Sequence, residues 1–222
     1  MERGLARFRR MLREGRYLFH FHTSLTDGYA SLQDYCEAAK ELGFKYVTLM
    51  EHVRRVNSYD FSALVREVAR VRERFRPMEI FLGVEAKVLP GGLLDVSDEV
   101  LAKVDVLGIA NHSFPLEAHP VPEATASAFE RYRARGIARV WLHPGLHLLD
   151  ATESSLHLVE GLLALALERG VFVEFNLRYG LPPEELRTPV PASRVVLGVD
   201  AHSIADVEAS AAALLSAKNC FA

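Results

Sequence analysis

The chain has 222 residues, of which half are hydrophobic and a quarter are charged. This composition is typical of a globular domain and excludes a disordered or collagen-like chain. Because 26 Lys and Arg stand against 29 Asp and Glu, the net charge is −3, and no overall positive field would attract nucleic acid or an anionic membrane. The two cysteines, Cys36 and Cys220, form no CxxC pair, and no signal peptide is present, so we expect a reduced, cytoplasmic protein.

The chain begins with a basic amphipathic segment. Leu5, Phe8, Met11 and Leu12 recur at helical spacing among several arginines. We predict a helix within residues 1–16 that packs on or caps the domain, rather than one that binds a membrane surface or nucleic acid. No stretch reaches the roughly 18 consecutive apolar residues of a transmembrane helix, so we expect no membrane partner.

Short runs of β-branched and aromatic residues alternate with helical patterns along the rest of the chain. The predicted strands are Tyr17–His22, Lys45–His52, Ile80–Val88, Val104–His112, Arg139–His143, Val171–Leu177 and Val195–His202. The predicted helices are Leu32–Leu42, Phe61–Phe75, Pro122–Arg135, Ser154–Arg169 and Ile204–Ala217. This alternation is typical of an α/β domain with a parallel sheet, and it permits an open doubly wound sheet or a closed barrel. No linker interrupts it, which predicts one domain over residues 1–222.

Each predicted strand carries a polar residue at or near its carboxyl end. In chain order these residues are His20 and His22, Glu51 and His52, Glu85, His112, His143, Glu174 and Asn176, and Asp200 and His202. We take one representative per strand, at positions 20, 52, 85, 112, 143, 174 and 200. Consecutive positions are 26 to 33 residues apart, which is the length of one βα unit. Strand ends converge on one mouth in a closed barrel but form a line in an open sheet. The pattern therefore favours a seven-stranded (β/α) barrel.

The residue types at these strand ends indicate a metal site. Imidazole together with carboxylate suits zinc, manganese or iron. His20 and His22 are two residues apart, so on a strand both point to the same face, and the same holds for Asp200 and His202. These two pairs and Glu85 supply more ligands than one ion can take, and the two oxygens of Glu85 can bridge two ions. We therefore predict two or three divalent metal ions.

The motifs resemble those of the PHP (polymerase and histidinol phosphatase) superfamily from about Leu18 to Asp206. They read HFHTSLTDG at 20–28, LMEH at 49–52, GVEAKVLPGGLLDVSDEVLAKVD at 83–105, GIANH at 108–112, HP at 143–144, VEFN at 173–176 and GVDAHS at 198–203. Glu51 departs from the family pattern, since many members have Asp there.

The resemblance implies a distorted, TIM-like (β/α)7 barrel with a trinuclear metal centre at its mouth. By position, it assigns His20, His22, Glu85 and Asp200 to a first metal. Glu85 would bridge to a second metal with His112 and His143, and Asp27, His52 and His202 would bind a third. Asp27, in a TxxTDG loop, could equally be a turn former.

The ligand set predicts metal-assisted hydrolysis of a phosphate ester by a metal-bridging hydroxide. The resemblance implies a small phosphate monoester, histidinol phosphate or a similar compound, as the substrate. Asp200 would be catalytic as a metal ligand, and His52 or His202 could protonate the leaving group where a metal site is partly empty. The residues expected to bind substrate phosphate are Arg178, Arg54, Arg55 and Asn176, and Asn176 could instead orient a metal ligand.

Three alternatives stay open. A nucleotide or oligonucleotide phosphodiesterase of the same superfamily would use the same ligands, although the acidic balance disfavours long nucleic acid. A C–N metallohydrolase of the amidohydrolase type would need a bridging lysine, for which only Lys87 is placed. A scaffold or nucleic-acid-binding subunit would be expected to lack ligands and to carry a basic face.

Overall fold

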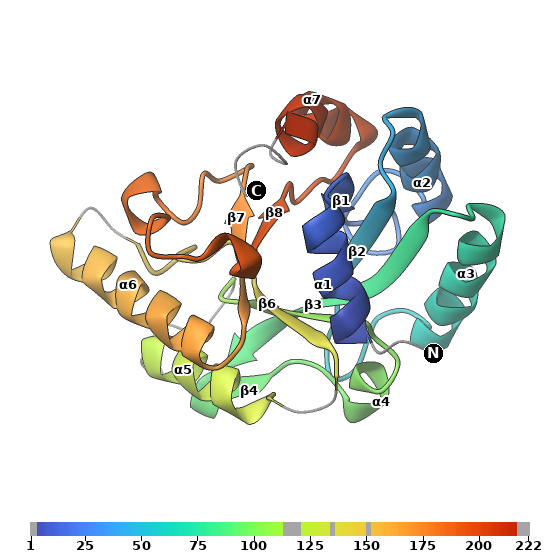
Figure 1. Cartoon of the computed structure of the whole chain (residues 1–222). Helices are drawn as coiled ribbons and strands as arrows, with labels where there is room; N and C mark the ends of the chain where they lie inside the picture. The colour runs from blue at the N-terminus through green and yellow to red at the C-terminus, as the bar shows by residue number, and fades with distance from the viewer. Residues whose placement is uncertain (1–3, 113–120, 134–135, 150–151, 217–222) are drawn as a thin grey trace.

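The computed structural model describes residues 4–112, 121–133, 136–149 and 152–216. Strands and helices alternate along these residues (Figure 1). The strands are β1 (Tyr17–Phe19), β2 (Tyr46–His52), β3 (Glu79–Leu89), β4 (Leu93–Leu94), β5 (Val106–Ala110), β6 (Ala138–Trp141), β7 (Phe172–Asn176) and β8 (Val195–Gly198). The α-helices are α1 (Gly4–Glu14), α2 (Leu32–Glu41), α3 (Phe61–Arg74), α4 (Asp98–Leu101), α5 (Val121–Arg131), α6 (Glu153–Glu168) and α7 (Ile204–Ser216).

Some of the predicted segments reach beyond the described residues. Residues 1–3 of the N-terminal segment, residues 134–135 and 217 at two predicted helix ends, and Cys220 lie outside them. Cys36 is buried on α2. No helix in the described ranges is long and apolar enough to span a membrane.

Seven of the strands that the structure describes form one parallel sheet in the order β1-β2-β3-β5-β6-β7-β8. The two edges of this sheet meet. Phe21 and Ala201 form a parallel bridge between the segments that follow β1 and β8, and the amide of Val199 donates to the carbonyl of Phe19 at 3.2 Å. The (β/α) barrel that the sequence predicts is therefore confirmed, and the open doubly wound sheet is excluded.

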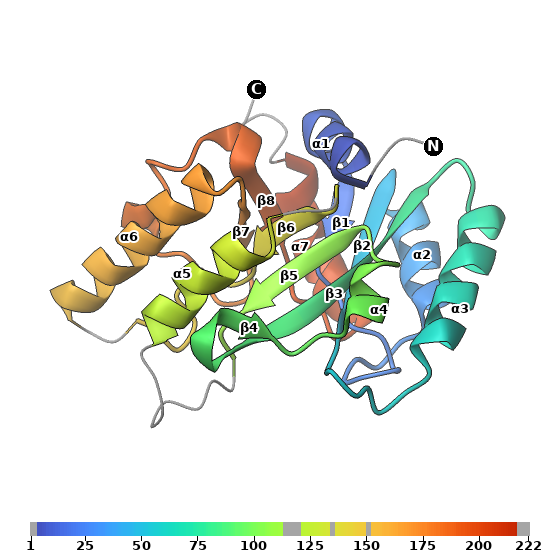
Figure 2. The same ribbon diagram turned by 90° about the horizontal axis from the view of Figure 1, so that it is seen from below.

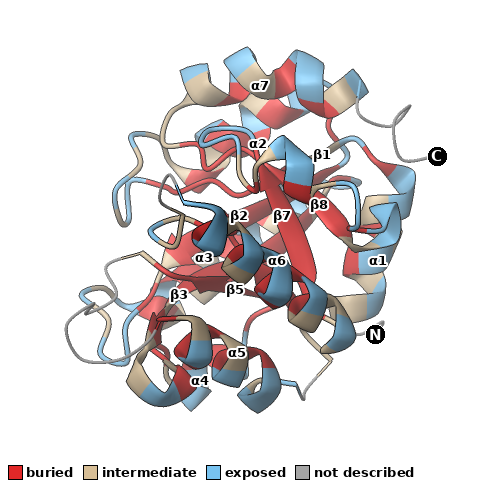
Figure 3. Cartoon of the chain, turned by 90° about the vertical axis from the view of Figure 1, so that its left-hand side faces the viewer, coloured by how far each residue is buried: buried red, intermediate tan, exposed pale blue. Residues whose placement is uncertain are grey.

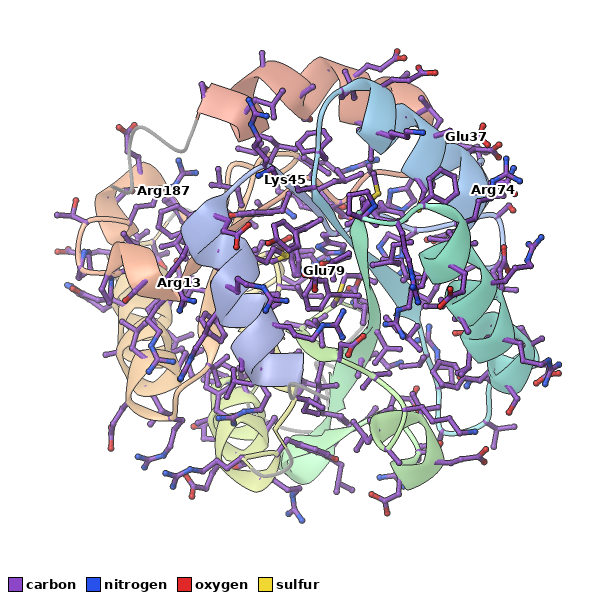
Figure 4. All side chains as sticks on the ribbon, turned by 45° about the vertical axis from the view of Figure 1, so that its right-hand side comes forward. Arg13, Glu37, Lys45, Arg74, Glu79 and Arg187 are labelled. Carbon is purple, nitrogen blue, oxygen red and sulfur yellow. The ribbon has the colours of Figure 1, made fainter. Side chains whose placement is uncertain are left out.

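Helices cover the outside of the barrel and bury one face each against the strands. Figure 3 shows the strands buried and the outward faces of the helices exposed. Side-chain caps fix where several helices start: Ser31 and Asp34 form a capping box on α2, and Asp60 caps α3. Glu37 of α2 and Arg74 of α3 form an ion pair at 3.0 Å between these neighbouring helices (Figure 4).

Helix α1 closes the amino end of the barrel. Phe8 and Met11 are fully buried, and the Phe8 ring packs edge-on against the rings of Phe19, Phe81 and Phe172. On the same helix Arg7 and Arg10 pair with Glu79 of β3, which lies beside α1 in Figure 4. Figure 2 shows α1 at the end of the barrel opposite the loops that follow β1 and β2. Within the described residues, a site inside the barrel therefore opens toward the carboxyl end.

Four strands end before the predicted ligand that follows them. β1 ends at Phe19, β5 at Ala110, β6 at Trp141 and β8 at Gly198, so these ligands lie in the loops after the strands. His20, His143 and Asp200 have φ values of 69°, 32° and 48°, which end the extended backbone. A left-handed conformation is costly for a residue with a Cβ, and it is found most often where function requires it.

Two short elements have no counterpart in the predicted pattern. β4 folds back antiparallel onto β3 through Gly91 and Gly92, whose φ values of 72° and 75° suit glycine. Helix α4 has four residues. Segments of two and four residues are too short to show a periodic hydrophobic pattern.

Candidate metal centre

The structure brings the nine predicted ligands together at the carboxyl mouth of the barrel. Five groups of three have ligand atoms that all lie within 4.8 Å of one another. The groups are His20 with His22 and Glu85; His20 with His143 and Asp200; His22 with Asp27 and His52; His22 with Asp200 and His202; and His52 with Glu85 and His112. Each of the nine belongs to at least one group, so residues from six strand ends and one loop share a single cluster.

Four of these ligands surround one point. The Nε2 atoms of His20 and His22 lie 3.2 Å apart, and Glu85 Oε2 is 3.2 Å and 3.3 Å from them. Asp200 Oδ1 is 3.4 Å from His20 Nε2 and 3.1 Å from His22 Nε2. Tetrahedral coordination at about 2.1 Å separates neighbouring ligand atoms by about 3.4 Å. The four side chains, all buried, therefore fit one tetrahedral divalent ion.

The hydrogen bonds of His20 explain which nitrogen would bind this ion. Its Nδ1 lies 2.6 Å from Glu174 Oε1, so the neutral ring carries its proton on Nδ1. The lone pair of Nε2 then faces the oxygens of Glu85 and Asp200, and such an arrangement is repulsive unless positive charge lies between them. The residues present therefore fit a cation.

The electrostatics of the cluster lead to the same conclusion. Burial alone would lower the pKa of His22, but hydrogen bonds to Asp200 and Glu85 raise it to about 9. Burial would raise the pKa of Asp200, but the charges of His20 and His22 hold it well below its usual range. The buried carboxylates thus favour positive charge at this point, from protons or from a metal.

Glu85 lies between the first ligand set and a second one. Its Oε2 faces His20 and His22, while Oε1 is 2.9 Å from His112 Nδ1 and 3.0 Å from His143 Nε2. Both ring nitrogens of His112 are buried, and Nε2 has no hydrogen-bond partner in the described part of the chain. The two oxygens of Glu85 are therefore placed to serve two ions.

A third set lies nearer the solvent. Asp27 Oδ2 is 3.2 Å from His52 Nε2 and 3.4 Å from His202 Nε2. Burial would raise the pKa of Asp27, but the nearby charges of His22, His52 and His202 lower it. Asp27 thus faces two histidines of the third set, in addition to lying in a turn.

Glu174 and Asn176 support the ligands from beneath. Glu174 Oε2 accepts from the amide of His143 at 2.6 Å and from Asn176 Nδ2 at 3.1 Å. Asn176, which we predicted at the substrate phosphate, is 0% exposed, and its Oδ1 accepts from the amide of Tyr179. The structure thus places the buried Asn176 side chain against Glu174 and the amide of Tyr179. The sequence contained one sign of this pairing: Glu174 and Asn176 are two residues apart in an apolar strand, so both side chains lie on the same face.

Glu51 holds the loop that carries Asp27. Its Oε1 accepts from the amide and the hydroxyl of Thr23, at 3.0 and 2.5 Å, and its Oε2 accepts from the Thr26 hydroxyl at 2.6 Å. Glu51 is fully buried, which raises the pKa of its carboxyl. Glu51, which stood among the polar strand ends, thus belongs to none of the ligand groups and fixes the loop instead.

The predicted arginines take different places. Arg178 Nη1 donates to the carbonyl of Asp200 at 3.0 Å and lies 3.2 Å from His202 Nδ1, so it is at the mouth. Arg54 lines a cleft next to Asp27 and His52. Arg55, by contrast, lines a separate groove with residues of α4 and the end of α5, away from the ligands. Sequence position alone could not show that these consecutive arginines point to different pockets.

The chain matches a known protein family. The PHP domain family matches residues 18–176. The DNA polymerase/3'-5' exonuclease PolX of Bacillus subtilis (strain 168) is 26% identical in an alignment of 196 residues, which covers 83% of this chain and 34% of that protein. The chain thus spans about a third of the length of this relative.

A solved structure shares the fold. The histidinol phosphate phosphatase (HISK) from Lactococcus lactis subsp. lactis Il1403, complexed with zinc, L-histidinol and phosphate, aligns with a TM-score of 0.63. The alignment covers 91% of this chain and 93% of that one at 13% identity. With most of its barrel matched in sequence and its fold shared with this structure, the chain belongs to the PHP domain family.

Proposed function

We propose that this chain is a metal-dependent phosphoesterase that hydrolyses a small phosphate monoester. The observation that carries the proposal is the placement of Glu85 between two sets of histidines, with the third set beside them. His20, His22, Glu85 and Asp200 would hold the first ion, Glu85, His112 and His143 the second, and Asp27, His52 and His202 the third. Zinc, manganese and iron all suit these ligands.

Bound divalent ions would supply positive charge to the phosphoryl oxygens and lower the pKa of an attacking water. The protein provides the rest of the phosphate site. Arg178 lies at the mouth beside His202, where its guanidinium can donate to a phosphate oxygen. Asp200, buried and ionised, keeps negative charge among the first ligands.

We assign protonation of the leaving oxygen to His202 rather than to His52. Burial lowers the pKa of His52 to about 4, so this ring is neutral near pH 7 and suited to bind a metal. The His202 ring is 21% exposed, lies next to Arg178 and faces Asp27 through Nε2. We assign it the proton-donor role for molecules whose third site is empty.

A small substrate is supported by the barrel itself. Helix α1 closes the amino end, and the net charge is −3, so neither a through-channel nor a basic field is available to a long nucleic acid. The structural neighbour that was solved with L-histidinol and phosphate supports a small phosphorylated compound. The likeness to PolX favours, as a second candidate, the phosphodiester of a nucleotide or oligonucleotide.

A substrate panel separates the two candidates. Zinc- or manganese-loaded protein would be assayed with p-nitrophenyl phosphate, histidinol phosphate, nucleoside monophosphates and a short single-stranded oligonucleotide. We expect phosphate release from monoesters and no shortening of the oligonucleotide. His20→Ala should abolish release, whereas His157→Ala, an exposed histidine on α6, should not. Shortening of the oligonucleotide without monoester turnover would favour the second candidate.

A further inference from the structure

A cleft of about 270 Å³ opens beside the third ligand set. It lies between the loops that follow β1 and β2, and its lining includes Leu25, Asp27, His52, Arg54 and Tyr59. Asp27 and His52 are predicted ligands, so the cleft starts at the metal centre. An ester whose phosphate is bound there would extend its alcohol part into this space.

The size of the cleft suits a small organic group. At roughly 30 Å³ per water molecule, it holds the volume of about nine waters, which is below the range of drug-sized pockets. Leu25 is 39% exposed and gives the cleft an apolar wall. Tyr59 is fixed by its hydroxyl, which donates to the carbonyl of His52 at 3.0 Å. The cleft therefore has a defined shape and room for one ring or a short chain.

Arg54 supplies the charge of the cleft. Its Nη1 donates to the carbonyl of Val53 at 2.9 Å, and its Nε lies 3.6 Å from Asp95 Oδ2. Its other N–H groups have no partner among the residues that the structure describes, and the side chain is 46% exposed. The amide of Arg54 donates to Asn57 Oδ1 at 2.7 Å, which ties down the loop that carries it. The guanidinium thus keeps donors free for a bound group.

Two carboxylates lie near Arg54, and both have other partners as well. Asp27 faces His52 and His202, and Asp95 accepts from the amide of Arg55 at 2.9 Å through its other oxygen. Among the described residues that line the cleft, Arg54 carries a charge at neutral pH, and the other ionisable side chains besides Tyr59 are the predicted ligands Asp27 and His52. An anionic group in this space would gain a partner, whereas an ammonium group would be repelled.

We propose that this cleft binds the alcohol part of the substrate and that Arg54 selects phosphate monoesters whose alcohol part carries a second anionic group, a carboxylate or a phosphate. The inference rests on the proposed phosphoesterase function and narrows its substrate class. It ranks histidinol phosphate, whose alcohol part carries an ammonium group, below an anionic ester of similar size.

The test compares three phenyl phosphates that differ at the para position: carboxylate, methyl and aminomethyl. Wild type, Arg54→Gln, Arg54→Glu and the control Arg66→Gln would be assayed with the same metal; Arg66 is an exposed residue of α3 that pairs with Asp60. For each ester, kcat/KM of the variant is divided by kcat/KM of wild type. Comparing these ratios between esters removes the intrinsic reactivity of the leaving groups.

We expect Arg54→Gln to lower kcat/KM for the carboxylate ester about tenfold more than for the methyl ester, the effect of one hydrogen bond to a charged group. Arg54→Glu should shift the preference to the aminomethyl ester, and Arg66→Gln should change no ratio. Equal ratios for all three esters in both Arg54 variants, with normal turnover of the methyl ester, would overturn this inference alone. Absence of turnover of every ester by metal-loaded wild type would overturn it together with the proposed function.

Discussion

Replacement of Glu174 by glutamine tests whether hydrogen bonds beneath the ligands prepare the metal centre. Glu174 accepts from His20 Nδ1 at 2.6 Å through one oxygen, and from the His143 amide and Asn176 through the other. A carboxylate can accept at both oxygens, whereas a glutamine amide has one acceptor and one NH2 donor. Because this site is fully buried, water cannot repair a mismatch.

Both orientations of the glutamine amide leave a conflict. With its NH2 toward His143, two donors of the protein lose their acceptor, at a cost of about 1 to 3 kcal/mol. With its NH2 toward His20, the ring must move its proton to Nε2, which removes the lone pair aimed at Glu85 and Asp200. Loss of such an orienting partner lowers metal affinity by about 10- to 100-fold.

Glu174→Gln should therefore either lose at least about 1 to 3 kcal/mol of unfolding free energy or bind zinc about 10- to 100-fold more weakly, according to the orientation that its amide takes. Urea unfolding of the metal-free protein measures the first effect, and titration against a chromogenic zinc chelator measures the second. Glu160→Gln, at an exposed position of α6, is the matched control and should change neither. Wild-type zinc affinity together with wild-type unfolding free energy in Glu174→Gln would refute the reasoning.

The other predictions concern the loop that carries Asp27, the packing of helix α1 and the pH dependence of zinc binding. Glu51→Ala removes the hydrogen bonds that hold the loop with Asp27, so the number of bound ions per chain should fall, while the most tightly bound ion remains. An unchanged metal content would show that Glu51 does not position this loop. Phe8→Ala leaves a cavity at the closed end of the barrel and should lower the urea-unfolding free energy by about 3 to 5 kcal/mol, and a loss under 1 kcal/mol would show that α1 is not a packed plug. Burial would lower the pKa of His22, but hydrogen bonds to carboxylates raise it to about 9 in the metal-free cluster. An ion that binds below that pH must therefore displace a proton from this ring. Zinc affinity, measured with a chelator of known pH dependence, should rise by at least about tenfold per pH unit between about pH 6 and pH 8, because the pKa of His20 is raised as well, and a flat profile would exclude this proton displacement.

The positions of the ligands along the chain could be predicted because each βα unit has a similar length and ends in a recognisable residue type. His52 and Glu85 lie on regular strands, as expected. His20 and Asp200 face the same point for a different reason than strand alternation, since both have left-handed backbones that follow the strand. Long-range contacts impose that conformation, and hydrophobic periodicity does not report it.

Side-chain direction outside regular strands was the harder part. Arg54 and Arg55 are neighbours in sequence, yet they line different pockets because the loop between β2 and α3 turns at this point. Asn176 has the residue type of a substrate contact, but strand β7 points it toward Glu174 inside the barrel. Such roles depend on which partner the fold brings within hydrogen-bond distance.

The metal content of the reconstituted protein tests the central claim most directly. Purified chain would be stripped with a chelator, loaded with zinc or manganese, freed of excess ion and analysed by mass spectrometry for metals, with p-nitrophenyl phosphate turnover measured on the same samples. We predict two to three ions per chain and turnover that depends on them, both reduced in His20→Ala and retained in His157→Ala. Less than one ion per chain, without metal-stimulated phosphate release, would contradict the account.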